Sequence, residues 1–384
     1  MAEISTPEFL RAKGVDTIIV PPPLVEPNEL TSEWFTSALR HAGRLDTARV
    51  IDCETTPIGT GQVADTLLFR LTYDHHEAAA PAAVVAKVAA ADADSRAGAV
   101  GQRLYEREVR FYQNLQSRTE VTTPRHIYSD IDPATGRFIL LLEDLSPTAS
   151  VNQLSGFGVE HARLAMDQAA ALHAPLWGSE TLDELSWLNH TRTNGAAIAQ
   201  TAPMLTEAFC ERYADSLAAA DVAAIRQLNN FTAVFWTQQR EPRTVIHGDF
   251  RPDNMLFDAK GGEVPLAVLD WQTIDHGNGL LDVAFLLGTA LDPDVRRSQE
   301  HDLVRRYFDG LLTRGVRAYD WTQCWTDYRF HACYGLYFLT VAAMMVERTE
   351  RGDAMFLTMI RRVLAQIADL DTVTLLQAGD ADTV

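Results

Sequence analysis

The chain has 384 residues, which is long enough for two lobes, and its composition of 47% hydrophobic and 22% charged residues is that of a globular protein. Its 33 basic and 52 acidic residues leave a formal net charge of −19. This balance argues against a nucleic-acid or anionic-membrane partner and permits cationic or neutral ligands.

Targeting signals and cysteine spacing point to the same compartment. The first residues, MAEISTPEFLRAKG, lack the charged-then-apolar pattern of a signal peptide. The four cysteines form no C-x-x-C pair and no zinc-like spacing, which favours a reducing environment. We therefore expect a cytoplasmic protein without membrane insertion, and its oligomeric state stays open.

The first part of the chain predicts an arm, a helix and three strands. Residues 1–30 end in VPPPLVEP, where successive prolines forbid a helix and favour an extended arm. In NELTSEWFTSALRHAG, Thr31 is the expected N-cap of a helix. Strand patterns separated by turn residues follow at 48–58, 65–74 and 82–90.

The middle of the chain predicts one long helix and a hairpin. Residues 95–116 place Leu104, Val109, Tyr112 and Leu115 on roughly one face of that helix. Residues 123–145 predict a hairpin turned at 132–136.

The remainder predicts a mainly helical lobe. After about residue 148 the pattern is helical, apart from short strands around 245, 256 and 268. The apolar run 334–346 is shorter than the roughly 20 residues of a membrane span and predicts a core helix. The expected fold is α+β and bilobal, with an arm (1–30), a small antiparallel-sheet lobe (31–145) and a larger helical lobe (146–384).

One loop concentrates polar residues between two strand-like runs. In VIHGDFRPDNMLF, the loop carries His247, Gly248, Asp249, Arg251 and Asn254. Such density between apolar runs indicates a rigid loop with chemistry on it, although for a single loop a polar turn between strands is the simpler explanation.

Two charged residues in the first lobe predict an ion pair. Lys87 lies in the apolar strand VVAKVAA, where burial is costly unless the ammonium is paired. Glu108 lies on the next helix and could neutralise it. An outward-facing position at a sheet edge is the alternative for Lys87.

Two further features fit a phosphate and metal site. Gly59 and Gly61 form a turn between strands, where backbone N–H groups can approach phosphate oxygens. Asp270 ends the apolar strand of LAVLDWQ, 21 residues after Asp249, and could bind a metal ion. A plain hairpin turn and a capped turn are the respective alternatives.

The order of these features is that of a protein-kinase-like phosphoryl-transfer site. HGDFRPDN followed by LDWQ resembles the aminoglycoside phosphotransferase and choline kinase group. LLLEDL, AALHAPLWG and GLLDVAFLLG are most similar to its ecdysteroid-kinase-like (CHK-kinase-like) branch. The resemblance covers about residues 31–370.

The resemblance implies a bilobal kinase-like fold, with ATP and Mg²⁺ as cofactors and a small-molecule hydroxyl as acceptor. Asp249 is expected to accept or orient the proton of that hydroxyl. Asn254 and Asp270 are expected to bind Mg²⁺. Lys87 is expected to hold the α- and β-phosphates, with Glu108 fixing its position.

The resemblance also implies supporting roles. Backbone groups of Glu143 to Leu145 are expected to bind adenine where the strand leaves the first lobe. His247 is expected to pack and hydrogen-bond within the loop, and Asp282 to hydrogen-bond the loop backbone from a buried helix. A simple helix N-cap is the alternative for Asp282.

Three positions depart from the protein-kinase pattern. Ala64 stands where a third glycine is usual, so the phosphates are expected to be gripped less closely. Trp271 and Gln272 replace Phe-Gly after the metal-binding Asp, so a flip of that segment is not to be assumed. Arg251 stands where protein kinases carry a lysine that neutralises the transferred group, and a surface arginine is the alternative.

We therefore expect a kinase that transfers the γ-phosphoryl group of ATP to a small molecule, with a metal-dependent phosphoesterase and a catalytically silent kinase-like module as alternatives. Asp74-His75-His76 is the feature that suggests a phosphoesterase, but that class leaves Lys87 and Glu108 unexplained. The acceptor stays open among hydrophobic hydroxylated metabolites, sugars and aminoglycosides.

Overall fold

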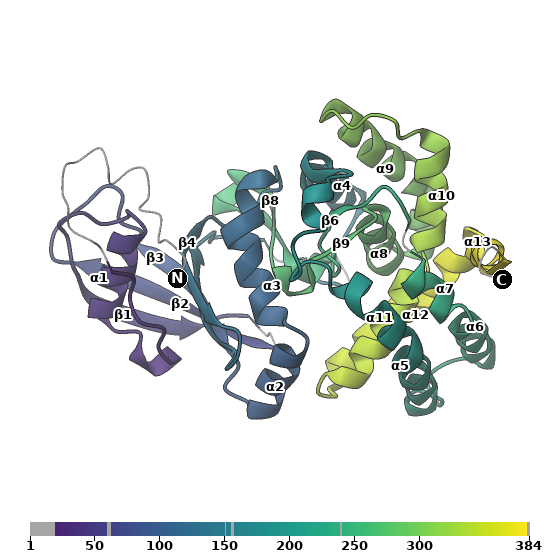
Figure 1. Ribbon diagram of the computed structural model, residues 1–384, viewed down its shortest axis with the longest axis horizontal. Helices are drawn as coiled ribbons and strands as arrows, with labels where there is room; N and C mark the ends of the chain where they lie inside the picture. The colour runs from purple at the N-terminus through teal and green to yellow at the C-terminus, as the bar shows by residue number, and fades with distance from the viewer. Residues whose placement is uncertain (1–19, 60–62, 150, 155–156, 239, 382–384) are drawn as a thin grey trace.

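The computed structural model describes residues 20–59, 63–149, 151–154, 157–238 and 240–381. The first part of the chain folds into a five-stranded antiparallel sheet with the strand order β1-β2-β3-β5-β4 (Figure 1). Its strands are β1 (Val50–Pro57), β2 (Ala64–Tyr73), β3 (Ala83–Ala89), β4 (His126–Asp132) and β5 (Arg137–Glu143). The three expected strands and the expected hairpin are thus confirmed.

Helices cover both faces of this sheet. Helix α1 (Ser32–His41) starts at Thr31, whose hydroxyl accepts a hydrogen bond from the backbone N–H of Trp34, as expected for an N-cap. The α1 residues Phe35 and Leu39 pack with one set of alternating strand residues, including Val84 and Ile139. Because side chains alternate across a strand, Lys87 in β3 lies on the opposite face, toward the following helices.

The expected long helix over 95–116 is interrupted. Helix α2 (Ala93–Gly101) ends before Arg103, which adopts a left-handed conformation with φ 56°, and α3 (Leu104–Arg110) begins after it. A π-helical turn (Phe111–Leu115) and a 3-10 turn (Gln116–Arg118) continue α3. A single left-handed residue leaves the apolar periodicity almost unchanged, so the pattern could not reveal the break.

The second part of the chain is mainly helical, as expected. Its helices are α4 (Val159–His173), α5 (His190–Arg212), α6 (Ala219–Asn229), α7 (Thr232–Thr237), α8 (Leu280–Ala290), α9 (Pro293–Thr313), α10 (Trp321–His331), α11 (Tyr334–Met345), α12 (Glu350–Asp369) and α13 (Thr372–Ala381). Helix α8 is buried on every side, which marks it as the central helix of this lobe (Figure 1).

Four short strands frame the polar loop. They form two antiparallel pairs, β6 (Thr244–Ile246) with β9 (Asp275–Gly277), and β7 (Met255–Ala259) with β8 (Val264–Val268). The sequence pattern predicted three of these strands and missed β9, whose residues Asp-His-Gly have no strand-like pattern. The loop at 247–254 therefore runs from β6 into β7.

The lobes meet along the segment that follows β5. Ala149 forms a bridge with Phe257 of β7, and Leu145 packs with Ala259 and Ala267. The overall class, a small antiparallel sheet joined to a larger helical part, is the one expected from the sequence. The division at 30/31 and 145/146 stays a prediction, and residues 1–19 of the expected arm lie outside the described part.

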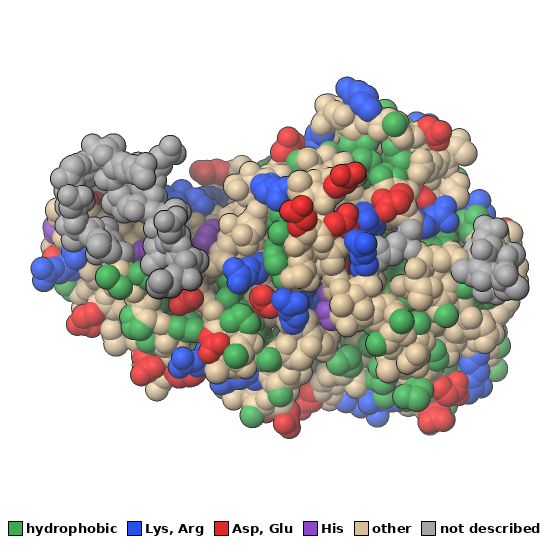
Figure 2. All heavy atoms as spheres, in the orientation of Figure 1, with side chains coloured by type: hydrophobic (Ala, Val, Ile, Leu, Met, Phe, Trp, Pro, Cys, Tyr) green, Lys and Arg blue, Asp and Glu red, His purple; other side chains and the backbone are tan. Residues whose placement is uncertain are grey.

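Among the described helices, none combines the length and apolarity that crossing a membrane requires. Helix α11 contains all but the last residue of the apolar run 334–346 and packs into the core, apart from the exposed Met345 at its end. Figure 2 shows acidic and basic side chains interspersed on one face of the molecule.

Trp271 joins the two lobes. Its indole is fully buried and stacks on Phe111 with ring centroids 3.7 Å apart, and it lies 4.8 Å from the imidazole of His247. The indole N–H donates to the Thr123 hydroxyl at 3.1 Å. The side chain is thus held by contacts from both lobes.

Trp271→Ala should lower the free energy of unfolding by about 3–5 kcal/mol, because it leaves a cavity between Phe111 and His247. Trp271→Phe should cost less, since an aromatic ring remains and only the hydrogen bond to Thr123 and part of the packing are lost. Denaturant titration measures both, with the partly exposed Trp321→Phe as control. A Trp271→Ala variant as stable as wild type would contradict this account.

Candidate active site

Lys87 connects three segments of the chain. Its ammonium lies 2.7 Å from Glu108 Oε1 on α3 and 3.3 Å from Asp270 Oδ1, just after β8. The Glu108 side chain is fully buried, and the Lys87 side chain is 13% exposed. The expected pair of Lys87 and Glu108 is therefore present, and the structure adds Asp270 to it.

The charges in this group depend on one another. Burial alone would lower the pKa of Lys87, but the carboxylates of Asp270 and Glu108 outweigh it and raise that pKa to about 12. Burial raises the pKa of Glu108, and the Lys87 ammonium opposes this effect. Removal of the Lys87 ammonium would leave Glu108 and Asp270 without their shared cation, and the charge of Asp270 raises the pKa of Glu108 further.

The polar loop is held from below by the central helix. The Asp282 carboxylate, in the first turn of α8, accepts hydrogen bonds from the backbone N–H groups of His247 (2.6 Å) and Gly248 (2.9 Å). Gly248 has φ 80°, and a Cβ there would lie 2.5 Å from the Thr273 carbonyl oxygen. The expected contact between Asp282 and the loop backbone is confirmed, and the loop conformation requires glycine at 248.

His247 packs beneath the loop, as expected. Its Nδ1 accepts a hydrogen bond from the Asp249 backbone N–H at 3.2 Å, so its Nε2–H donates to the Leu269 carbonyl oxygen at 2.8 Å. The side chain is fully buried. It thereby ties the start of the loop to the strand that leads to Asp270.

The loop brings Asp249, Arg251 and Asn254 together. The Asn254 side-chain amide donates to the Asp249 carbonyl oxygen (2.8 Å) and to its carboxylate (2.9 Å). Arg251 Nε lies 2.9 Å from Asp249 Oδ1, and its Nη1 donates to Asp253 Oδ2 at 2.9 Å. Arg251 is only 20% exposed, so it is not the surface arginine of the alternative interpretation.

Opposite charges hold Arg251 in its ionised form. Burial opposes the charge, but Asp249 and Asp253 outweigh it and raise the pKa of Arg251. The guanidinium also reaches the Met355 sulfur at 3.6 Å, which connects the loop to α12.

A backbone hydrogen bond brings the segments of Asn254 and Asp270 together. The Leu269 N–H donates to the Asn254 carbonyl oxygen at 2.9 Å, which brings Asn254 next to the segment of Asp270. Asp270 has φ 64°, an unusual conformation that aspartate tolerates better than most residues. Lys87 outweighs the effect of burial and lowers the pKa of Asp270, so its carboxylate is ionised.

The remaining expected nucleotide contacts are only partly described. Gly59 has φ 78° and follows β1, whereas Gly61 lies outside the described residues. The Glu143 N–H already donates to the Arg125 carbonyl oxygen, and the Leu145 carbonyl oxygen accepts from the Lys260 N–H. An adenine bound at 143–145 would therefore use other backbone groups of this segment.

Several buried residues that support the loop were not assigned a role from the sequence. His173 at the end of α4 donates from Nε2 to Asp282 (3.1 Å) and accepts from the Tyr307 hydroxyl (2.9 Å). Tyr334 donates to the Gly248 carbonyl oxygen at 2.6 Å. Their helices lie far apart in the sequence, and only AALHAPLWG, which contains His173, gave a signal.

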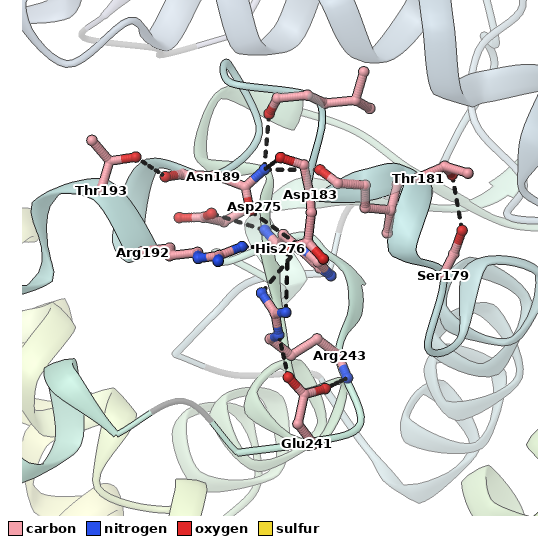
Figure 3. Close-up of polar contacts among 12 residues, drawn as sticks. Ser179, Thr181, Asp183, Asn189, Arg192, Thr193, Glu241, Arg243, Asp275 and His276 are labelled. Carbon is pink, nitrogen blue, oxygen red and sulfur yellow. Dashed lines mark hydrogen bonds and ion pairs between the residues drawn. The ribbon is translucent and has the colours of Figure 1, made fainter.

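A second polar network fixes β9 and the start of α5 (Figure 3). His276 Nδ1 lies 3.1 Å from Asn189 Oδ1 and 3.4 Å from the guanidinium of Arg243. Asp275 accepts from both the backbone N–H (2.9 Å) and the hydroxyl (2.5 Å) of Thr191. This network anchors the first turn of α5 to the segment that follows Asp270.

The small antiparallel sheet, the helical lobe and the polar loop between them define a kinase-like protein. The profile of the ecdysteroid kinase-like family matches residues 61–315, and the chain belongs to this family. The resemblance stated from the motifs is thus confirmed.

Solved structures agree on the fold. A choline kinase from Cryptosporidium parvum superposes with a TM-score of 0.50 at 10% identity, over 81% of this chain and 88% of that one. An ethanolamine kinase from Plasmodium vivax gives a TM-score of 0.51 at 10% identity, over 88% and 87%. At this identity the similarity concerns the fold alone.

Curated relatives match only a short stretch. Acyl-CoA dehydrogenase family member 11 of Gallus gallus is 36% identical over 75 residues, which is 20% of this chain and 10% of that protein. Family member 10 of Mus musculus is 38% identical over 71 residues, 17% of this chain and 6% of that protein. The matches span a tenth or less of these relatives.

Lys87→Met should lower the free energy of unfolding by about 3–5 kcal/mol, because Glu108 would stay buried without its cation. The double variant Lys87→Met, Glu108→Gln should regain part of this loss. The loss in the single variant should shrink as the pH falls, since the pKa of Glu108 is already raised by burial and a protonated Glu108 needs no cation.

Denaturant titration across pH measures these effects. The matched control is Lys260→Met, which breaks the more exposed pair with Glu143 and should cost less than about 1 kcal/mol. Equal effects of the Lys87 and Lys260 substitutions would show that burial does not govern the Lys87 pair.

Proposed function

We propose that this protein is a Mg²⁺-dependent kinase that transfers the γ-phosphoryl group of ATP to a hydroxyl of a small molecule. The observation that supports this most is the convergence of Lys87, Glu108 and Asp270, with ammonium–carboxylate distances of 2.7 and 3.3 Å. Burying these three charges contributes little to stability by itself, because removing them from water is costly. It is useful where a cation must be held ready for phosphates.

In this proposal the nucleotide lies between the sheet and the polar loop. Lys87 binds the α- and β-phosphates, and Glu108 fixes the position of its ammonium. The turn of Gly59 and Gly61 covers the phosphates through backbone N–H groups. Adenine lies against the backbone of the segment from Glu143 to Leu145.

The donor set fits Mg²⁺. Asp270 offers a carboxylate, and Asn254 offers its amide oxygen because its amide nitrogen is already engaged by Asp249. Magnesium prefers oxygen donors and takes its other ligands from phosphates and water, so two protein ligands suffice. When bound, the ion neutralises charge on the β- and γ-phosphates.

Asp249 is proposed to orient the acceptor hydroxyl and take up its proton. The Asn254 amide and the Arg251 guanidinium hold its carboxylate in one orientation. Arg251 would also fork onto oxygens of the transferred phosphoryl group and stabilise the charge that develops there. Both side chains come from one extended stretch of the loop, which directs them to the same side.

The acceptor is proposed to be a small hydroxylated molecule, either a hydrophobic metabolite or an antibiotic. The phosphoesterase alternative relied on Asp74-His75-His76, but Asp74 accepts from the Arg49 N–H at 2.9 Å and pairs with His75 at 2.8 Å in an exposed turn. These contacts explain Asp74-His75-His76 as residues that stabilise a turn. A catalytically silent module stays as the second candidate until turnover is measured.

Asp249→Ala should lower turnover on the order of 10²–10⁴-fold and leave the affinity for Mg-ATP nearly unchanged. Asp270→Ala should instead abolish the Mg²⁺-dependent part of nucleotide affinity, because it removes the carboxylate ligand. ATP consumption with a panel of hydroxylated metabolites and antibiotics measures the first effect, and calorimetric titration the second.

The control for both variants is Asp258→Asn, an exposed carboxylate on β7 near the loop. Mg²⁺-dependent nucleotide binding without any acceptor-dependent turnover would favour the silent module. Release of phosphate from a phosphomonoester without nucleotide would favour the phosphoesterase.

Arg251→Ala should lower kcat roughly 10–10³-fold with little change in the KM for ATP, since its contact strengthens in the transition state. Arg251→Lys should recover part of the loss as a point charge without the planar fork. Steady-state kinetics measures both variants. If Arg251→Ala kept the wild-type kcat, the guanidinium would contribute only its contacts with Asp249 and Asp253, and the proposed contact with the phosphoryl group would be wrong.

A further inference from the structure

Tyr334 lies at the centre of a group of side chains beside the proposed catalytic loop. It opens helix α11, is 6% exposed, and donates its hydroxyl hydrogen to the carbonyl oxygen of Gly248, the residue before Asp249. The Trp236 ring from α7 lies beside it, and the charge of Arg107 from α3 acts on its hydroxyl. We call Arg107, Trp236 and Tyr334 the donor cluster.

Arg107 is a buried cation with incomplete hydrogen bonding. It is 5% exposed, and its terminal nitrogens reach only the carbonyl oxygens of Ile274 (3.4 Å) and Gln102 (3.3 Å). Its Nε has no hydrogen-bond partner, and no carboxylate among the described residues forms an ion pair with the guanidinium. Such a group is costly to bury unless a ligand completes its contacts.

Trp236 supplies a second donor without a partner. Its indole Nε1 is buried and makes no hydrogen bond, and its ring lies 6.1 Å from that of Tyr334. Helix α5 packs directly against it, since a Cβ on Gly195 would lie 2.5 Å from the Trp236 carbonyl oxygen. A buried indole usually finds a partner for its N–H, so this one is an unsatisfied donor.

Electrostatics connects the donor cluster to the proposed catalytic carboxylate. Burial raises the pKa of Tyr334, the charges of Asp282 and Asp249 raise it further, and the charge of Arg107 opposes them. Arg107 also faces Asp275 and Arg103. The backbone gives the same connection, because Ile274, which accepts from Arg107, follows Thr273, which lies against Gly248.

The Asp249 carboxylate has one oxygen that lacks a hydrogen-bond donor. Its Oδ1 is ion-paired with Arg251 but accepts no hydrogen bond, so a hydroxyl donor would complete it. The polar network of Figure 3 differs in this respect: His276, Asn189 and Asp275 in it already have partners for their polar groups, and it holds α5 and β9 in place.

Resting on the function proposed above, we infer that the donor cluster binds the phosphoryl acceptor through a carbonyl or carboxylate oxygen. The reacting hydroxyl would donate to Asp249 Oδ1, while an oxygen elsewhere on the same molecule accepts from Arg107 and Trp236. The acceptor class is then a hydroxy acid or hydroxy ketone, and polycationic aminoglycosides are disfavoured by the buried guanidinium.

The first test compares stabilities and needs no acceptor. Trp236→Phe keeps an aromatic ring and removes an N–H without a partner, so its unfolding temperature should equal or exceed that of wild type. The matched control is Trp271→Phe, which removes an N–H that donates to Thr123 and should lower the unfolding temperature. A similar decrease for both variants would make Trp236 a structural donor and overturn the inference.

The second test measures specificity in the wild-type chain with ATP and Mg²⁺. Its probes are pairs of hydroxylated compounds that differ only in a carboxylate or ketone against an amine, together with kanamycin as a polycation. The wild type should favour the oxygen-bearing member of each pair. Trp236→Phe and Arg107→Met should each raise the KM for that member about 10–100-fold, without changing the KM for ATP.

Arg107→Lys separates charge from geometry and should recover part of the affinity for carboxylates. Preference for the amines, or Arg107→Met kinetics identical to wild type, would overturn the inference while the kinase activity stands. If no compound is phosphorylated beyond the Asp249→Ala background, the proposed kinase function fails, and the unfolding temperatures still decide whether the donor cluster is structural.

Discussion

The architecture of the site depends on one buried ammonium group. Lys87 projects from the centre of β3 and is neutralised by Glu108 from α3 and by Asp270 from the end of β8. An unpaired charge in this position would be strongly destabilising, so the three segments stabilise the fold only when they meet. The sheet, the helix behind it and the helical lobe are thereby placed relative to one another by a single electrostatic requirement.

A second requirement holds the polar loop in shape. Helix α8 is buried on all sides, yet it carries Asp282 in its first turn. That carboxylate is satisfied by two loop N–H groups and by His173, which Tyr307 in turn supports. The loop therefore gains its rigidity from buried partners, and Asp249, Arg251 and Asn254 are held in place by contacts with one another.

The sequence predicted most of the fold because its signals are local. Period-2 alternation and turn residues located the sheet, Thr31 located the start of α1, and the spacing of Asp249, Asn254 and Asp270 indicated that these residues lie together. The loop motif also indicated the contact of Asp282 with the loop backbone, because the resemblance placed that residue on a buried helix.

What the sequence missed depends on contacts between distant segments or on single residues. No sequence pattern singles out Tyr334 or Arg107, because only the packing of α11 and α3 in the folded chain places them near the loop. The strand β9 is three residues long and exists because β6 offers it a partner. The surroundings of Arg251 could not be predicted either, because Met355 and Asp253 enclose it only in the folded chain.

The left-handed conformation of Arg103 determines which segments of this lobe tolerate a change in length. Because the helical register that places Glu108 opposite Lys87 starts anew after Arg103, it does not depend on the length of α2. Residues 93–101 are largely exposed and rich in small side chains, with Ala99 as their only buried member. Insertions, deletions or a fused peptide in α2 should therefore be tolerated, whereas a one-residue change between 104 and 108 would turn Glu108 away from the lysine.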